Sequence, residues 1–487
     1  MIKKLHYSLA ITFFTVSLGW AQTACSGGKA GAYPCKDYDL MSNLPVATLA
    51  NSNLSANGSA PEGSDVWGWT DPTTNKEYAI AAMTNSTAFV DISDPVNPVF
   101  LGRLDSNAGN NFWRDVKVYN NHAFIVADNT GNHGMQVFDL TRLRGVSTPQ
   151  TFTADQVFTD VSSCHNIVIN EAKGIAYLVG CRATNGGGPI FVDISDPKNP
   201  KNLGDYKGAG YSHDAQVVTY KGPDAAYTNK EIYIGSNENE IVVLDVTDKT
   251  NVKKISAINY SQIGYTHQGW FTDDHRYFIL GDETDERNFG MNTRTLVFDL
   301  ADLDNPKLSS TYFGPTKAID HNGYVKGKDF FMASYRAGMR VLDLTNISAS
   351  TNAMTEKAYF DTFPADDNAG FAGAWSVYPY FPSGNIIIND IQRGLFVVRK
   401  SGTLSTDSVT KNTVSYQLSP NPTQSNPTIT TVNGTIKSVV VYTILGKKVF
   451  SSNGLSTTRF EIPMAAYAKG IYLVRINGSI SKKLIVQ

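Results

Sequence analysis

Phe89-Val-Asp91-Ile-Ser-Asp94-Pro95-Val-Asn-Pro98 decides the fold, because it returns almost unchanged as Phe191-Val-Asp193-Ile-Ser-Asp196-Pro197-Lys-Asn-Pro200. The apolar start of this stretch predicts a β-strand, since β-branched and aromatic residues favour extended backbone. Asp and Asn then start a turn by bonding their own backbone, and proline prevents further ladder pairing. Weaker copies of the same strand and turn begin at Val137, Val243, Val297 and Val341, and a truncated seventh copy lies at 395–398.

A second repeated signal is a histidine at one register of the repeat. It occurs as Ser-Ser-Cys-His165-Asn, Gly-Tyr-Ser-His213-Asp, Gly-Tyr-Thr-His267-Gln and Ala-Ile-Asp-His321-Asn, with spacings of 48, 54 and 54 residues. A period near 50 indicates stacked or radial repeats. Such an array brings equivalent positions together around one axis, so we expect these four of the eight histidines to share one face.

Each unit of the repeat contains about four short strands and no long helical pattern. Seven such units predict an all-β chain in which residues 22–400 form a seven-bladed β-propeller. A linear solenoid is the competing architecture. The last unit ends after three strands, and we expect residues 44–49 near the start of the chain to supply the missing outer strand. Pro45 is compatible with that position, since proline is tolerated on a sheet edge.

The four cysteines suit two disulfides in an exported protein. Cys25 and Cys35 lie close together around a glycine-rich loop. Cys164 and Cys181 flank a short turn at 171–174, and in a hairpin centred there the two cysteines face each other. We therefore predict the pairs Cys25–Cys35 and Cys164–Cys181, with free buried thiols at 164 and 181 as the alternative.

Both ends of the chain differ in composition from its body. Residues 1–21 have a basic start, a short apolar run and small residues before Gln22, which predicts a cleaved signal peptide rather than a membrane span. A lipoprotein anchor at Cys25 is a weaker alternative. Residues 401–412 are small and polar, as in a linker, and 413–487 have the short alternating strands of a small β-sandwich.

Charge is distributed unevenly along the chain. The whole chain has a net charge of −2, but residues 413–487 carry eight Lys or Arg and one Glu, and residues 22–412 carry −11. An acidic body argues against a nucleic-acid partner. We also expect no transmembrane span after the signal segment, because no later stretch is long and apolar enough.

The C-terminal 75 residues resemble the type A sorting domain of the type IX secretion system of Bacteroidota. The resemblance is carried by Ser419-Pro-Asn-Pro422, Leu445-Gly-Lys447 followed by Val449, Gly470-Ile-Tyr-Leu-Val474 and Lys482-Lys-Leu-Ile-Val486. It implies passage through the periplasm and the outer membrane, contact between residues 413–487 and the secretion machinery, and removal of this domain. Attachment to the cell surface or release would follow.

Residues from about Cys25 to Arg399 resemble the choice-of-anchor B family, which is built from LVIVD-type propeller repeats. The matching segments are Cys25…Tyr33-Pro-Cys35, Asp65-Val-Trp-Gly-Trp-Thr-Asp71, Phe112-Trp-Arg-Asp-Val-Lys117, Cys164-His165-Asn166, Ser212-His213-Asp214 and Thr266-His267-Gln268. The resemblance implies a propeller fold and an extracellular location. It implies no agreed biochemical activity.

We expect a ligand-binding site at the rim where the innermost strand of each blade begins. Converging histidine, carboxylate, arginine and tryptophan side chains at a concave mouth are typical of a binding site. The candidate residues are His165, His213, His267, His321, Asp115, Asp282, Arg336, Trp67 and Trp375. Equally, each histidine could serve only to hydrogen-bond a neighbouring blade.

These residues leave two functional classes open. The favoured class is a non-catalytic surface protein that binds a glycan, a peptide or a protein partner at this rim. The alternative is an exported metal-assisted hydrolase. No cofactor is certain, but a divalent metal is a candidate because imidazole is a common ligand, with His213 and His267 as the candidate ligands. The sequence spells out no complete nucleophile or metal motif, so no catalytic residue is predicted.

Overall fold

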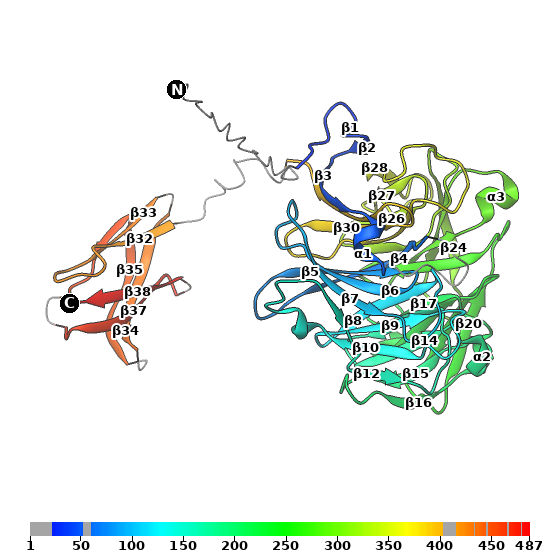
Figure 1. Cartoon of the computed structure of the whole chain (residues 1–487), viewed down its shortest axis with the longest axis horizontal. Helices are drawn as coiled ribbons and strands as arrows, with labels where there is room; N and C mark the ends of the chain where they lie inside the picture. The colour runs from blue at the N-terminus through cyan, green and yellow to red at the C-terminus, as the bar shows by residue number, and fades with distance from the viewer. Residues whose placement is uncertain are drawn as a thin grey trace, which may run out of the picture. The chain divides into compact units, whose positions relative to one another are not determined.

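The computed structural model describes residues 22–51, 60–402, 415–432, 434–444, 447–464, 467–478 and 480–487. The predicted signal peptide at 1–21 and most of the predicted linker at 401–412 lie outside these ranges. The chain divides into two compact units, Met1–Ser401 and Gly402–Gln487. Both units consist of small β-sheets, and no helix of the described residues is long and apolar enough to cross a lipid bilayer (Figure 1).

The described part of the first unit contains seven sheets of four to six strands, and all but one pairing within them are antiparallel. Each sheet has an innermost strand that packs against the innermost strands of its two neighbours. The innermost strands are β4 (Gly63–Thr70), β8 (Arg114–Tyr119), β13 (Asn166–Asn170), β17 (Asp214–Thr219), β21 (Thr266–Phe271), β25 (Gly323–Lys326) and β29 (Ala374–Tyr378). They pack in this order, and β29 in turn packs against β4. This cyclic order is consistent with a propeller-like fold.

The second and third strands of each sheet are its most buried, because both faces pack on neighbouring sheets. The second strands are β5 (Glu77–Met83), β9 (His122–Ala127), β14 (Ile175–Val179), β18 (Glu231–Ser236), β22 (Tyr277–Asp282), β26 (Asp329–Ser334) and β30 (Asn385–Asp390). The third strands are β6 (Ser86–Asp91), β10 (Met135–Asp139), β15 (Ile190–Asp193), β19 (Ile241–Asp245), β23 (Arg294–Asp299), β27 (Gly338–Asp343) and β31 (Gly394–Lys400).

The outer strands complete the sheets. They are β7 (Val99–Asp105), β12 (Gln156–Phe158), β16 (Lys201–Asp205), β20 (Lys253–Ile258), β24 (Lys307–Phe313), β28 (Thr355–Phe360) and β3 (Tyr38–Leu44). Two sheets are extended further by β11 (Gln150–Phe152), which pairs parallel to β7, and by β2 (Tyr33–Lys36) with β1 (Lys29–Ala30) beyond β28. The helices are short: α1 (Val46–Leu49), α2 (Arg182–Asn185), α3 (Asp285–Phe289) and three 3₁₀ turns at Leu140–Leu143, Lys207–Ala209 and Ala225–Tyr227.

The repeated aspartate that ends the third strand starts a turn, as the sequence predicted. Asp91 and Asp193 each accept a hydrogen bond from the backbone NH two residues further on, at 3.0 and 2.9 Å. The equivalent bond forms in the weaker copies at Asp139, Asp245, Asp299 and Asp343. The carboxylate thus replaces a ladder partner at the end of the strand, and the chain can reverse.

The N-terminal segment completes the last sheet, but at a different position from the one predicted. The outer strand of that sheet is β3, which pairs antiparallel with β31 from Tyr38 opposite Lys400 to Leu44 opposite Leu395. The prediction of a strand at 44–49 is wrong, because α1 occupies Val46–Leu49. Proline has no backbone NH for a ladder bond, so the strand ends before Pro45, whose carbonyl accepts the first bond of the helical turn from Thr48 at 2.9 Å.

Both predicted disulfides, Cys25–Cys35 and Cys164–Cys181, are present, so all four cysteines are paired. The second one continues the register of the hairpin formed by β13 and β14, in which Asn166 lies opposite Val179 and Asn170 opposite Ile175. The alternative of free buried thiols is therefore excluded by the structure.

The second unit contains a three-stranded and a four-stranded sheet that share one apolar core. Side chains of both sheets contribute to this core, among them Tyr416 and Ile429 from one and Val441 and Val474 from the other. The first sheet has the order β32 (Ser415–Ser419), β33 (Thr428–Val432) and β36 (Arg459–Glu461); the second has the order β35 (Lys448–Thr457), β34 (Ile436–Thr443), β37 (Gly470–Ile476) and β38 (Ile480–Val486).

Candidate functional site

The four repeated histidines form a row at the ends where the innermost strands begin. The ring centroids of His165 and His213 are 4.1 Å apart, and those of His213 and His267, and of His267 and His321, are both 4.3 Å apart. Trp375 continues the row beyond His321, with ring centroids 4.7 Å apart. The repeat therefore places imidazoles from four consecutive sheets in van der Waals contact with one another.

Three of these imidazoles are held in place through their Nδ1 atoms. Nδ1 of His213 lies 3.2 Å from the carbonyl oxygen of His267, and Nδ1 of His321 lies 2.6 Å from the carbonyl oxygen of Trp375. Nδ1 of His165 lies 2.9 Å from a carboxylate oxygen of Asp128. The Nδ1 atom of His267 is buried without a hydrogen-bond partner. Because a carbonyl oxygen only accepts, Nδ1 carries the hydrogen in His213 and His321.

Burial keeps most of the row uncharged. It lowers the pKa of His321 to about 3, and it lowers the pKa values of His213 and His267 well below their usual 6.5, with the neighbouring imidazoles acting in the same direction. The pH dependence near 6.5 that free histidines would produce is therefore not expected from these three residues.

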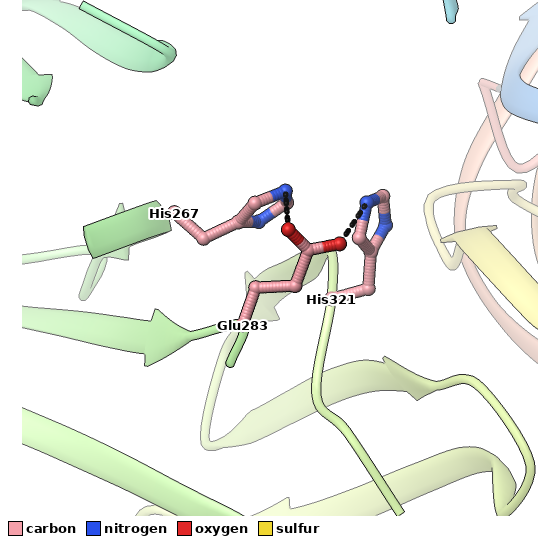
Figure 2. Close-up of side chains that lie close together, drawn as sticks. All are labelled: His267, Glu283 and His321. Carbon is pink, nitrogen blue, oxygen red and sulfur yellow. Dashed lines mark ion pairs between the residues drawn. The ribbon is translucent and has the colours of Figure 1, made fainter. Parts of the chain in front are cut away.

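Glu283 lies between two of the histidines, directly after the end of β22. Its carboxylate oxygens are 3.7 Å from Nε2 of His267 and 3.7 Å from Nε2 of His321, and Figure 2 shows the two rings on either side of the carboxylate. The hydroxyl of Tyr335 donates a hydrogen bond of 2.8 Å to the same carboxylate. Burial raises the pKa of Glu283 to about 7, with a smaller contribution from the nearby Asp282, while the hydrogen bond from Tyr335 acts in the opposite direction.

A pocket of about 380 Å³ opens beside this cluster. Five aromatic side chains, two glutamates and one isoleucine line it: Phe112, Trp113, Tyr335, Phe371, Trp375, Glu62, Glu283 and Ile391. Phe371 is 45% exposed, so an apolar ring faces solvent at this pocket. Burial raises the pKa of the Glu62 carboxyl. A volume of this size is in the range of small-molecule sites.

Trp375 lines this pocket, whereas Trp67 does not. Trp67 lines a separate cavity of about 100 Å³ together with Lys117, Glu171 and Trp270. The expectation that Trp67 shares the rim of the histidines is therefore wrong. Trp67 is the fifth residue of β4, which begins at Gly63 and has a register shift before Val66, whereas the histidines lie at or just before the start of their strands.

Asp115 bonds to a neighbouring sheet instead of facing the pocket. Its side chain accepts a hydrogen bond of 2.8 Å from the backbone NH of Ile167 and pairs with Lys117, which also lies 3.2 Å from Asp65. Other innermost strands repeat this contact through Gln216, which accepts from Phe271 NH, and Gln268, which accepts from Gly323 NH. Polar side chains of three innermost strands therefore join each of them to the next innermost strand.

Asp282 and Arg336 do not line the pocket either, and both side chains are engaged in other contacts. Asp282 is fully buried and accepts hydrogen bonds from the Tyr260 hydroxyl and the Gly264 NH, both at 3.0 Å. Arg336 forms an ion pair of 2.8 Å with Asp366. Of the nine residues predicted for the site, the four histidines and Trp375 come together, and the other four lie elsewhere.

Sequence reasoning left several pocket residues out of the predicted site. Glu283, Trp113, Tyr335 and Phe371 are the main ones. Trp113 directly precedes β8 as His213 directly precedes β17, so the repeat register alone could have found it. Glu283 directly follows the end of β22, so the position of the strand end in the repeat could also have identified it. Phe371 lies outside any strand, and no repeat signal marks it.

Comparison with known proteins identifies two repeated or modular parts of the chain. Residues 417–487 match the family of secretion-system C-terminal sorting domains. Residues 76–106 and 231–258 match the LVIVD repeat. The sorting domain shows that the protein is exported by the type IX route to the cell surface or secreted, and it implies contact with the secretion machinery. The chain is thus a secreted or cell-surface repeat protein.

Similarity to individual proteins is limited in extent. The chain is 31% identical to methanethiol oxidase of Hyphomicrobium sp over 114 residues, which are 23% of this chain and 24% of the relative. Among solved structures it is similar to PorZ, a surface component of the type IX secretion system of Porphyromonas gingivalis, with 12% identity, a TM-score of 0.42 and coverage of 85% of this chain and 58% of PorZ. Hydrazine synthase of Kuenenia stuttgartiensis has 13% identity and a TM-score of 0.47 over 66% of this chain and 92% of its own.

Proposed function

We propose that this exported protein is a non-catalytic binding protein that holds its ligand in the aromatic pocket beside the histidine row. The pocket carries the proposal, since it combines a ligand-sized volume of about 380 Å³ with five aromatic walls and two carboxyl groups. Sites for small ligands typically combine apolar walls with a few placed polar groups.

The lining indicates the charge of the ligand. Among the described residues that line the pocket, Glu62 and Glu283 are the carboxylic acids, and none is a lysine or arginine. Arg287 lies close by, 4.9 Å from the centre of the Phe371 ring, but it is not among the lining residues. An anion in the pocket would meet the two carboxyl groups first, so the pocket favours a neutral or cationic group. Aromatic rings such as Trp113 and Trp375 offer flat apolar faces to a sugar ring and negative faces to an amine. A glycan residue or a basic peptide side chain fits both conditions.

Tryptophan fluorescence tests this proposal directly, because Trp113 and Trp375 lie in the pocket. Residues 22–487 would be titrated with neutral oligosaccharides and with lysine-rich peptides. We expect a saturable change with at least one of the two ligand classes, and its loss in Trp375→Ala and Phe371→Ala. Trp270→Phe is the matched control, since Trp270 lines the separate cavity. Binding that survives both pocket substitutions would overturn the proposal.

We also propose that the seven sheets are the blades of one closed seven-bladed propeller. The cyclic packing of the innermost strands and the pairing of β3 with β31 support closure. The pairing of β3 with β31 would join the N-terminal and C-terminal strands of the domain in one blade. An experimental structure with a gap between β29 and β4 would contradict this, and so would one with six or eight blades.

The chain's assignment to the choice-of-anchor B family is likewise a proposal, supported by the two matched LVIVD repeats. Under it, residues 22–400 are the functional domain of the mature protein. The sorting-domain match adds the proposal that 401–412 are a linker and that 413–487 are removed during export.

A further inference from the structure

Three side chains of metal-ligand type meet beside the pocket. Among the described residues, His267, Glu283 and His321 form a group whose ligand atoms all lie within 4.8 Å of one another. They come from the start of β21, the end of β22 and the residue two before β25, so two adjacent sheets build the group (Figure 2). Both imidazoles are buried.

The hydrogen bonds around the group leave a nitrogen of His321 without a hydrogen close to a carboxylate. Nδ1 of His321 donates to the carbonyl oxygen of Trp375 at 2.6 Å, so Nε2 of the neutral ring carries no hydrogen. This bare Nε2 lies 3.7 Å from Oε1 of Glu283. Two electron-rich atoms repel each other in a buried site, and either a proton or a metal ion between them removes this repulsion.

His267 completes the same arrangement from the other side. Its Nε2 lies 3.7 Å from Oε2 of Glu283, which is beyond hydrogen-bond distance, and its Nδ1 is buried without a partner. Buried polar side chains are normally paired. The His267 ring therefore lies next to Glu283 and His321, and neither of its nitrogens has a hydrogen-bond partner in the group.

We propose that His267, Glu283 and His321 bind a divalent transition-metal ion such as Zn²⁺. Imidazole nitrogen and carboxylate oxygen are suitable ligands for such an ion, and tetrahedral bonds of about 2.1 Å place ligand atoms about 3.4 Å apart. The two separations of 3.7 Å, one to each oxygen of Glu283, are close to this spacing, and all three ligand atoms lie within 4.8 Å of one another. Of the two predicted metal candidates, His267 belongs to the group and His213 does not.

Neighbouring groups orient these ligands. The Trp375 carbonyl fixes the hydrogen on Nδ1 of His321, and the Tyr335 hydroxyl donates to Glu283 at 2.8 Å. Such outer contacts are typical of metal sites, because they set the ring orientation and the lone pair that binds. The arrangement is thus prepared for an ion by residues that are not themselves ligands.

The proposed site leaves a coordination position open towards the pocket. Of the three proposed ligands, Glu283 lines the pocket, next to Tyr335 and Trp375, whereas His267 and His321 line a smaller cavity of about 10 Å³. Three protein ligands are one fewer than a closed structural zinc site has. An oxygen atom of the pocket ligand can take the fourth position. This last step rests on the proposed binding function, whereas metal binding itself does not.

Isothermal titration of chelator-treated residues 22–487 with Zn²⁺ tests the site. We expect one tight equivalent of Zn²⁺ per chain, weakened at least about tenfold by Glu283→Gln and lost in His267→Ala. Glu283→Gln keeps an acceptor for Tyr335, so circular dichroism should show an intact fold. The matched control is Asp302→Asn, which alters an exposed group of Asp224, Asp302 and Asp304.

The possible results distinguish the metal site from the proposed ligand-binding function of the pocket. Failure of the wild-type protein to bind Zn²⁺ overturns the metal site, and so does binding that Glu283→Gln leaves unchanged. Binding lost only in Asp302→Asn overturns it too and assigns the ion to the exposed carboxylates. Ligand binding that is lost in Trp375→Ala, with Zn²⁺ binding retained, supports both sites independently. A metal-binding protein that binds no pocket ligand contradicts only the proposed function.

Discussion

Replacing Asp214 by asparagine should stabilise the first unit above neutral pH. Asp214 is the first residue of β17 and is 7% exposed. Its side chain accepts a hydrogen bond of 2.6 Å from the NH of Ala215. Burial raises the pKa of Asp214 from 3.8 to about 7, although the positive charge of Lys117 acts in the opposite direction. Asparagine has the same shape and keeps the acceptor, but it never ionises.

The structure sets the size and the sign of the effect. One pKa unit corresponds to 1.36 kcal/mol, so a rise from 3.8 to about 7 makes ionised Asp214 cost about 4 kcal/mol. Between about pH 4 and 7 the folded protein keeps a proton that the unfolded chain has released. The contribution of Asp214 to stability therefore falls as pH rises through this window, and the full cost is present above pH 7.

Urea unfolding of residues 22–487 at several pH values between 4 and 8 measures the effect. All the tryptophans after Trp20 lie between Trp67 and Trp375, so their fluorescence reports only the first unit. The difference in unfolding free energy between Asp214→Asn and wild type should grow from near zero at pH 4 to about 4 kcal/mol at pH 8. Subtracting the unfolding free energy of the wild type cancels the titrating groups that do not interact with Asp214; Asp115, whose pKa the charge of Asp214 raises, is one that does.

Asp160→Asn is the matched control, because Asp160 is exposed. Its difference from the wild type should stay flat with pH. The reasoning is refuted if Asp214→Asn shows the same difference at pH 4 and pH 8, or if it destabilises the protein at pH 8. Either outcome would mean that the buried carboxyl is not held protonated by its surroundings.

Three further predictions concern stability and processing. Lys117→Met should lower the unfolding free energy at pH 7 by roughly 3–5 kcal/mol in urea titrations, because it leaves buried aspartates without their cation; a loss below about 1 kcal/mol would contradict this. Replacing both Cys164 and Cys181 by serine should cost about 3 kcal/mol, since the disulfide closes a loop of 17 residues, and unchanged urea midpoints would disagree. The intact mass of protein from its native host should correspond to a chain that begins near Gln22 and lacks residues 413–487; a retained tail would count against removal of the sorting domain.

Local chemistry made much of this protein predictable from its sequence. The strand and aspartate turn at Phe89 and Phe191 needs only neighbouring residues, and the register of the hairpin at 171–174 determined the Cys164–Cys181 pair. The four histidines came together because equivalent positions of a repeat meet around one axis. The sorting domain could be recognised because its motifs are contiguous.

Tertiary structure decided which of these side chains share a site. Trp67 lies five residues into β4 and lines a separate cavity. The carboxylates of Asp115 and Asp282 accept hydrogen bonds from the Ile167 NH and the Tyr260 hydroxyl, so both are engaged in structural contacts. Glu283 meets His321, 38 residues further along the chain, only because their sheets pack side by side. Burial then set the protonation of the site by lowering the pKa of His321 and raising that of Glu283. A sequence pattern specifies neighbours along a strand, whereas distances between sheets and loss of solvent arise only when the whole chain has packed.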